Sequence, residues 1–219
     1  MKFPDRLVLA DASGRGARLA SVRGGVFEFE ISSAEGAIES FANLLLRLCE
    51  KSGARPADIG AFALCVGPGS ILGTRVASAA ICAIAEVSGA KILVWDILQT
   101  GARALAKRGE KAPFALFAPS RKGFANCLTF DGSAVLGERE IDLSRAIPPD
   151  SLPENRILLD QKKTAEPFLS NMPRADFSME QIWGALRENP ELLEEAKSPP
   201  NAKSLSEREY VKWKAPALI

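Results

Sequence analysis

The sequence predicts an α/β protein, in which a mixed β-sheet carries helices on its faces. Three observations indicate this class. The chain opens with three short segments that have the pattern of strands, and after residue 32 segments of helical periodicity alternate with short apolar runs. A turn rich in glycine at residues 67–73 joins one apolar run to an alanine-rich segment. With 219 residues and 47% hydrophobic residues, the chain can bury a substantial core.

The first three segments predict an antiparallel meander. Residues 7–10 are apolar throughout and indicate a buried strand. Residues 16–22 and 26–31 are separated by Gly24 and Gly25, a pair typical of a tight hairpin turn. In the third segment phenylalanine and isoleucine alternate with glutamate, so one face of the strand is apolar and the other is charged.

A helix is predicted next, between a capping box formed by Ser32 and Glu35 and a stop at Gly53. Its apolar residues recur at helical spacing, which predicts one face that packs against the sheet. They are Ile38, Phe41, Leu44, Leu45 and Leu48.

The centre of the chain combines a strand, a glycine loop and a helix. Residues 61–66 are predicted to form a buried strand, and the helix is expected to run from a cap at Thr74 to Gly89. Such a loop can bind phosphate, because its backbone N–H groups and the helix N-terminus face a ligand. The spacing fits neither the Walker nor the Rossmann motif. Spacing alone therefore favours a tight turn that lets helix and strand pack closely.

The later elements repeat the pattern after a polar linker at residues 108–113. A lobe boundary is placed there, giving an N-terminal lobe of residues 1–110 and a C-terminal lobe of residues 111–219. Before the linker we expect a strand at 92–95 and a helix at 97–107. After it we expect strands at 114–118, 124–130 and 156–160, a helix capped by Ser178 and Gln181, and another starting at Asn189 and Pro190.

Composition excludes several kinds of site. The chain has no histidine, which removes Ser-His and Cys-His nucleophiles and the commonest metal ligand. The cysteines have no C-x-x-C spacing, so buried free thiols in a reducing compartment are expected rather than zinc ligands. Lys plus Arg (28) nearly equals Asp plus Glu (27), which argues against binding nucleic acid by bulk charge. No signal peptide and no membrane-crossing stretch are predicted.

The glycine loop and its flanks resemble the TsaB family, whose hallmark is a GPGSFTGxR-type loop after a strand. The resemblance implies an actin-like ATPase (ribonuclease-H-like) fold of two lobes, each with a mixed sheet and flanking helices, the second reduced. Tyr210 stands where the family has a Tyr-Leu-Arg segment, while Ile71 and Leu72 replace its usual Phe-Thr. The matching loop residues are Gly67, Pro68, Gly69, Ser70, Gly73 and Arg75.

By this resemblance the chain is a non-catalytic, cytoplasmic subunit of the complex that makes threonylcarbamoyladenosine in tRNA. Its partners would be a TsaD-type catalytic subunit and a TsaE-type ATPase, with tRNA involved indirectly and no membrane. No firmly bound cofactor and no metal are expected, and ATP or ADP is the candidate nucleotide between subunits. Relatives pair through two helices, which implies an interface formed by Phe41, Leu44, Leu45, Leu48, Val76, Ala79, Ala80 and Ala83.

Asp11 ends the first strand, where actin-like proteins use a carboxylate for metal and phosphate. We expect a turn-forming residue instead, because the mirrored turn at residues 119–123 offers Arg121 but no carboxylate. Arg75 can donate to a phosphate or partner carboxylate, or fix the loop through carbonyls, and both interpretations stay open.

Two other functions remain as alternatives. One is a stand-alone nucleotide-binding kinase or ATPase of the same fold, in which Asp11 and the glycine loop hold phosphates. The other is a homodimeric scaffold that has drifted from the pathway.

Overall fold

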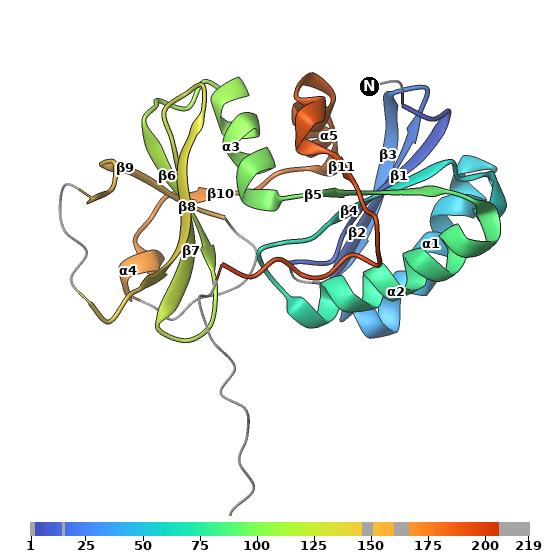
Figure 1. Cartoon of the computed structure of the whole chain (residues 1–219), viewed down its shortest axis with the longest axis horizontal. Helices are drawn as coiled ribbons and strands as arrows, with labels where there is room; N and C mark the ends of the chain where they lie inside the picture. The colour runs from blue at the N-terminus through green and yellow to red at the C-terminus, as the bar shows by residue number, and fades with distance from the viewer. Residues whose placement is uncertain (1–2, 15, 146–150, 160–166, 206–219) are drawn as a thin grey trace, which may run out of the picture.

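The protein consists of two mixed sheets with helices around and between them (Figure 1), here in a computed structural model that describes residues 3–14, 16–145, 151–159 and 167–205. The first sheet has the strand order β11-β5-β4-β1-β2-β3. Its strands are β1 (Arg6–Asp11), β2 (Ala17–Arg23), β3 (Val26–Ser33), β4 (Ala61–Cys65), β5 (Lys91–Trp95) and β11 (Glu194–Glu195). The predicted meander β1-β2-β3 is confirmed, and Asp11 pairs across it with Arg18.

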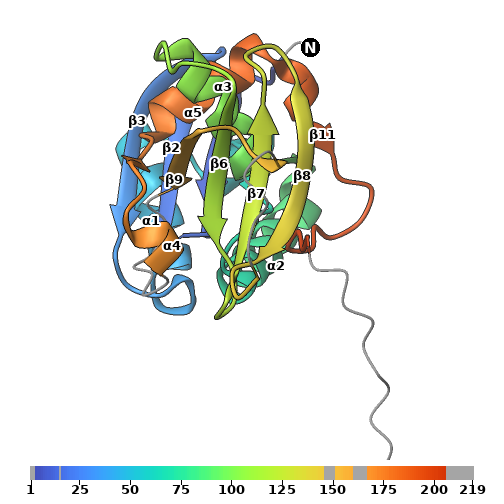
Figure 2. The same ribbon diagram turned by 90° about the vertical axis from the view of Figure 1, so that its left-hand side faces the viewer.

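The second sheet has the order β10-β9-β6-β7-β8, with β8 at one edge (Figure 2). The sequence pattern missed β8, because only one of its eight residues is buried and the strand shows little apolar alternation. The strands are β6 (Phe114–Pro119), β7 (Phe124–Phe130), β8 (Val135–Asp142), β9 (Asn155–Leu159) and β10 (Arg174–Ala175).

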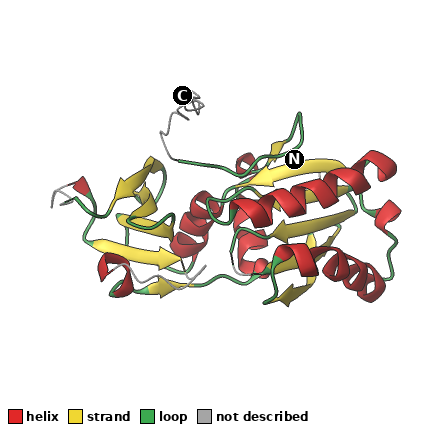
Figure 3. Ribbon diagram, turned by 90° about the horizontal axis from the view of Figure 1, so that it is seen from below, coloured by secondary structure: helices red, strands yellow, loops and turns green. Residues whose placement is uncertain are grey.

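The helices lie on both faces of the first sheet. Viewed from below, α1 (Ala37–Ser52) and α2 (Ile71–Ser88) run beside each other across one face (Figure 3). On the other face α3 (Ile97–Lys107) and α5 (Met179–Glu188) lie where the two sheets approach (Figure 1). A short helix, α4 (Pro167–Ser170), covers the second sheet, and two 3-10 turns occupy Pro56–Asp58 and Pro190–Leu192.

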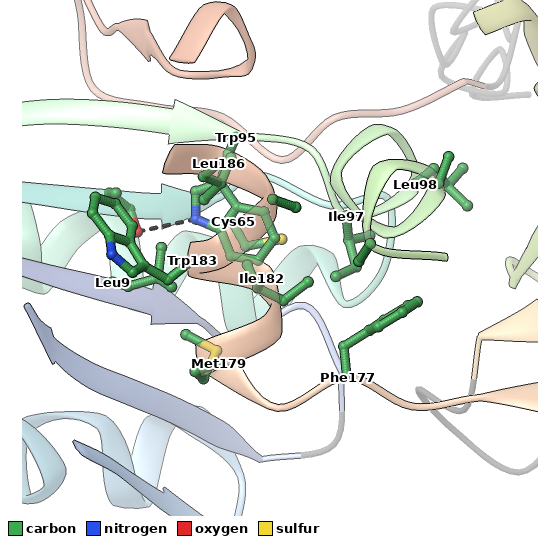
Figure 4. Packing of buried hydrophobic residues seen from close by; sticks show 14 of the residues in the cluster. Leu9, Cys65, Trp95, Ile97, Leu98, Phe177, Met179, Ile182, Trp183 and Leu186 are labelled. Carbon is green, nitrogen blue, oxygen red and sulfur yellow. Dashed lines mark hydrogen bonds between the residues drawn. The ribbon is translucent and has the colours of Figure 1, made fainter. Parts of the chain in front are cut away.

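One hydrophobic core spans both lobes. It joins side chains of both sheets, such as Leu9 and Leu116, to α3 and α5, where Leu98, Ile182 and Trp183 are at most 2% exposed (Figure 4). A separate core lies between α1, α2 and the first sheet. Because the lobes share their largest core, α3 and α5 fix one sheet relative to the other.

The lobe boundary at residue 110 separates the two sheets, but residues 111–219 do not all lie in the second lobe. Helix α5 packs on α3, and β11 pairs with β5 in the first sheet. Residues 196–205, called the strap below, then continue along α2 and across the ends of β4 and β5, where Ser78 Oγ and the Lys203 amide donate to carbonyls. Tyr210 lies outside the described residues.

Two predicted helix starts and one predicted helix need correction. Helix α1 begins at Ala37, with Gly36 as its N-cap, because Ser32 is still part of β3 and cannot form the predicted capping box. Helix α2 begins at Ile71 and is capped by Ser70, whose Oγ accepts from the Gly73 amide at 3.1 Å. The turn at Pro190 forms one 3-10 turn rather than a helix. The Ser178 capping box and the glycine stops of α1 and α2 are confirmed.

Helix α2 is long and apolar enough to cross a membrane by length and composition, the one such helix among the described residues. The expectation that no stretch is long enough is therefore wrong on this criterion. Of its 18-residue window, 33% is buried inside the structure. Core helices of soluble proteins meet the same criterion. Most of this apolar window lies outside the core.

Candidate functional site

The turn after β1 holds Asp11 in a closed set of contacts. Its carboxylate is 3% exposed, and Oδ1 accepts hydrogen bonds from the Ser13 amide at 2.9 Å and the Ser13 hydroxyl at 2.7 Å. Oδ2 accepts from Arg18 at 2.6 Å. Arg18 also donates to the Phe177 carbonyl at 2.6 Å. Both carboxylate oxygens are therefore engaged inside the chain.

These contacts keep Asp11 ionised. Burial by itself raises the pKa of the carboxyl group. The charge and hydrogen bond of Arg18, together with the bonds from Ser13, outweigh burial and leave the pKa below its ordinary value of 3.8. The side chain has the Asx-turn geometry considered from the sequence, and its negative charge is neutralised by an internal cation rather than left for a metal.

The glycine loop packs directly on this turn. The Ser70 amide donates to the Ser13 carbonyl at 2.6 Å. A Cβ atom at Gly69 would lie 2.2 Å from the Ser13 carbonyl oxygen, and one at Gly73 would lie 2.1 Å from the Ala12 carbonyl oxygen. Both glycines thus permit contact between two backbones, which is the close-packing role that the spacing favoured.

A cavity of about 250 Å³ lies beside the loop, between the N-termini of α1 and α2. Among its lining residues are Ser70 and Gly73 of the loop and Ile38 and Glu39 of α1, and none of the lining residues that the structure describes is a lysine or an arginine. The Glu39 carboxylate lies over the start of α1, where a Cβ atom at Gly36 would meet Glu39 Oε2 at 2.4 Å. Two helix N-termini favour an anion there, and the one charged side chain among the described lining residues is the Glu39 carboxylate.

The mirrored turn of the second lobe does have a carboxylate, although the sequence analysis found none there. Glu140 comes from β8, across the sheet from this turn, and accepts hydrogen bonds from Ser120 Oγ at 2.8 Å and from Arg121 at 3.0 Å. Arg121 also stacks on the Phe124 ring. Like Asp11, Glu140 is neutralised by an arginine of its own lobe. Because β8 itself was missed, no sequence signal placed Glu140 at this turn.

A third cluster joins the strap to both lobes. Lys203 Nζ contacts Asp96 Oδ2 at 2.6 Å and both oxygens of Glu138 at 2.7 Å. Asp96 is also the N-cap of α3, and Gln99 donates to Glu138 at 3.2 Å. Burial and the neighbouring Glu138 charge raise the pKa of Asp96, against the lowering effect of Lys203. The Lys203 ammonium thus separates two carboxylates that would otherwise repel each other.

Replacing Lys203 by methionine is expected to lower the free energy of unfolding by about 2 kcal/mol near neutral pH, because charge-assisted hydrogen bonds are lost in a half-buried place. The raised pKa of Asp96 means that its ionised form disfavours the native state, and this penalty develops as pH rises above 3.8. Removing Lys203 raises that pKa further, so the deficit should shrink towards acid pH. Urea unfolding of the variant and the wild type, at neutral and at acid pH, measures this deficit.

The control for this prediction is Lys91→Met, which removes an exposed ion pair to Glu195 of 2.9 Å. Since both side chains are more than half exposed, we expect a loss below about 1 kcal/mol. An equal loss in the two variants, or a Lys203→Met deficit that grows towards acid pH, would contradict the conclusion that Lys203 stabilises the protein by bridging Asp96 and Glu138.

The residues predicted for a partner interface divide into two groups. The four on α1 are 1–3% exposed and pack in the core between this helix and the sheet, so they do not reach the surface. That part of the prediction is corrected, because spacing by three and four residues places them all on the inward face. They are Phe41, Leu44, Leu45 and Leu48. The four on α2 are exposed or half-buried, namely Val76, Ala79, Ala80 and Ala83.

The outward faces of α1 and α2 carry other apolar residues. On α1, Ile38, Ala42 and Leu46 follow at steps of four residues and are exposed, Ile38 by 61%. On α2, Ile71 and Leu72 are 57% and 60% exposed at the N-terminus. With Ala79, Ala83 and Val87 further along α2, these residues form what we call the outer helix face. Arg75 is exposed beside it and forms no hydrogen bond or ion pair with a described residue.

No group of three or more cysteine or acidic residues that could hold a metal occurs in the described part of the chain. The four cysteines are free, and three of them are buried. Two carboxylates at the turns, each tied to an arginine, and an apolar helix face define the site. The class of protein is an α/β protein of two lobes, each built on a mixed sheet.

Comparison with solved structures gives this fold a specific counterpart. The chain is similar to a crystal structure described as an uncharacterized protein with similarity to peptidase YeaZ from Pseudomonas aeruginosa, with a TM-score of 0.65, 17% identity, and 93% of this chain and 100% of the other covered. The chain is also similar to YeaZ from Pseudomonas aeruginosa, with a TM-score of 0.61 and 16% identity, and 86% of this chain and 94% of the other are covered. No model of a known family and no curated protein matches the sequence. At such identities the similarity establishes the fold, which is that of YeaZ.

Proposed function

We propose that this chain is a non-catalytic, TsaB-like subunit of the complex that makes N6-threonylcarbamoyladenosine in tRNA, and that it pairs with and activates a TsaD-type transferase. The observation that carries the proposal is the outer helix face of α1 and α2. It belongs to a chain that has the YeaZ fold over nearly its whole length and the loop that resembles the TsaB family.

The outer helix face is suited to bury against another subunit. It exposes large apolar side chains on two neighbouring helices, with small alanines between them that allow a partner helix to approach closely. A contiguous apolar surface on a soluble chain typically marks an interaction site. Residues near its middle, such as Ala79, would be buried in the complex.

The saturated carboxylates support a non-catalytic role. Asp11 and Glu140 each accept a hydrogen bond from an arginine of their own lobe, so neither keeps the open, negative environment that binds a metal and a triphosphate. The chain has no histidine, so it cannot supply histidine ligands for a metal. We assign the chemistry to the partner.

Nucleotide, if it binds, is placed at the edge of this interface. The cavity at Ser70 and Gly73 lies between two helix N-termini, which favour the phosphates of ATP or ADP, and its described lining residues include no cation. Arg75, exposed beside the face, can then donate to a partner carboxylate or to the phosphates. A TsaE-type ATPase would join this pair in the cytoplasm, and tRNA would contact the partner.

The test is co-expression with the metal-bearing relative from the same organism, followed by size-exclusion chromatography with light scattering. We expect a stoichiometric complex that Ala79→Arg weakens at least about 30-fold, because an arginine would be buried without a partner at the centre of the interface. Position 79 is exposed in the free chain, so this variant should fold normally. Ala134→Arg, at an exposed alanine of the β7–β8 turn, is the matched control and should bind normally.

Modified-tRNA levels in cells that lack this chain should fall and should recover with the wild type but not with Ala79→Arg. Normal levels without the chain would overturn the proposal. A homodimer that never binds the relative would favour the scaffold alternative, and the exposure of Ile71 and Leu72 gives that reading its basis. ATP hydrolysis by the isolated chain, lost in Asp11→Asn, would favour the kinase or ATPase alternative.

A further inference from the structure

A second cavity, of about 410 Å³, lies between α3, α5 and the β2–β3 hairpin. Helices α3 and α5 are on the opposite side of the first sheet from α1 and α2 (Figure 1), so the cavity is separate from the outer helix face. Its size is within the usual range for small-molecule pockets, which combine an apolar wall with a few polar groups. The proposed pairing with a transferase makes no use of it.

Aromatic carbon forms one wall of this cavity. Phe27 of β3 and Trp183 of α5 line it, with Val26 at 63% exposure and Ala104 of α3 beside them. The indole Nε1 of Trp183 donates to the Gly25 carbonyl at 3.0 Å. Trp183 is 2% exposed and forms the floor of the cavity, so the apolar surface that a ligand can reach is that of Val26 and the half-buried Phe27.

Positive charge converges on the same cavity. Lys107 and Arg108 end α3, and Arg187 lies in the last turn of α5, whereas Glu180 is the one acidic lining residue. Lys107 donates to Glu188, and Arg108 donates to Gln181 and to the Asp176 carbonyl. An ammonium has three donors and a guanidinium five, so several remain for a ligand. Arg187 donates to no described residue.

Gly184 keeps space open between these groups. It lies in the interior of α5, where glycine is less favourable than alanine by about 1 kcal/mol. A Cβ atom placed there would meet only Lys107 Nζ, at 3.7 Å, and no backbone atom within 4 Å. The close packing that requires Gly69 and Gly73 is therefore absent at Gly184, and the missing side chain enlarges the cavity beside the ammonium.

We propose that this cavity binds a small organic anion that carries a flat ring. The ring would pack on Phe27 and Val26, and the anionic group would accept hydrogen bonds from Lys107 and Arg187. Glu180 would oppose an anion, which makes it the natural residue for a gain-of-binding variant.

Phenyl phosphate is the test probe, because it joins a ring to a dianion, with inorganic phosphate and phenol as its separate halves. Calorimetry should give a dissociation constant below about 1 mM for phenyl phosphate and weaker binding of either half. In an NMR titration the methyl signals of Val26 should move and those of Val135, an exposed valine of β8, should not. Val26→Ala assigns the signal.

Two variants should weaken binding at least about tenfold, each for its own reason. Gly184→Leu fills the cavity with a good helix former and should fold at least as stably as the wild type, and Arg187→Gln removes a donor. Glu180→Gln should strengthen binding. Arg47→Gln, at an exposed cation of α1, is the control and should leave it unchanged.

No binding of phenyl phosphate, or equal binding to wild type and Gly184→Leu, would overturn the site. If inorganic phosphate bound as tightly as phenyl phosphate, the proposal that the ligand carries a ring would be wrong. All four variants should still form the complex with the transferase, so failure of this inference and failure of the proposed pairing give different results.

Discussion

Replacing Arg18 by leucine is expected to lower the free energy of unfolding by about 3–5 kcal/mol near neutral pH. Arg18 is the counter-charge of Asp11, whose carboxylate is 3% exposed, and it also donates to the Phe177 carbonyl. Leucine keeps the aliphatic volume but leaves a buried carboxylate without its cation. Chemical denaturation monitored by circular dichroism measures the loss.

The effect should depend on pH in a defined direction. In the wild type the pKa of Asp11 lies below 3.8, so its contribution to stability is complete above that value and is lost as pH falls through the folded-state pKa. Without Arg18, burial raises the pKa of Asp11, and protonation in acid relieves the unpaired charge. The deficit of the variant should therefore shrink as pH falls.

Two controls test the assignment to burial. Arg55→Leu removes a direct contact to Asp58, 2.8 Å long, but with Arg55 82% exposed, and should leave the free energy of unfolding nearly unchanged. Asp11→Asn combined with Arg18→Leu should be less damaging than Arg18→Leu alone, since no buried charge remains. A double variant that loses the sum of both single losses would show that the two residues do not act as a pair.

Gly73→Ala is expected to destabilise the protein by about 2–3 kcal/mol, because the new Cβ atom would lie 2.1 Å from the Ala12 carbonyl oxygen. That oxygen belongs to backbone, so relief requires the start of α2 to move away from the turn after β1. Helix propensity alone favours alanine by about 1 kcal/mol, and the observed loss should be net of this gain. Thermal unfolding of the two proteins side by side measures it.

Gly184→Ala is the matched control, since it is also a glycine inside a helix but its Cβ atom meets only Lys107 Nζ at 3.7 Å. It should stabilise the protein, by up to about 1 kcal/mol. Opposite signs at the two positions would establish that Gly73 is required by backbone packing. If Gly73→Ala were neutral in stability but impaired nucleotide or partner binding, the packing role would be wrong and a ligand role would replace it.

The sequence predicted the glycine loop between a strand and a helix but placed the cap of that helix four residues late. Thr74 was expected to cap α2, whereas Ser70 does, and Gly73 lies inside the helix. The loop glycines suggested a ligand, yet Gly69 and Gly73 face the carbonyls of Ser13 and Ala12. A contact between segments about 60 residues apart leaves no local trace, so spacing could suggest close packing but not identify the partner.

The interface prediction failed on α1 for a related reason. Helical spacing correctly grouped Phe41, Leu44, Leu45 and Leu48 on one face, but the sequence cannot say whether a face meets the chain's own sheet or another protein. In the structure these four side chains are 1–3% exposed and therefore face the chain's own sheet, whereas Ile38 and Leu46 are more than 50% exposed. The outward stripe has fewer apolar residues and is therefore the weaker sequence signal.

What the sequence by itself determined is local: the β1-β2-β3 meander with its Gly24-Gly25 turn, the alternation of strands and helices, the glycine stops and the absence of histidine. These features depend on backbone propensity and on spacing within one segment. Tertiary structure alone decided the partners of charged groups, such as Arg18 with Asp11, Arg121 with Glu140 and Lys203 with Asp96 and Glu138. Charged residues occur throughout the chain without periodicity, and their pairing depends on which strands and strap segments the fold places side by side.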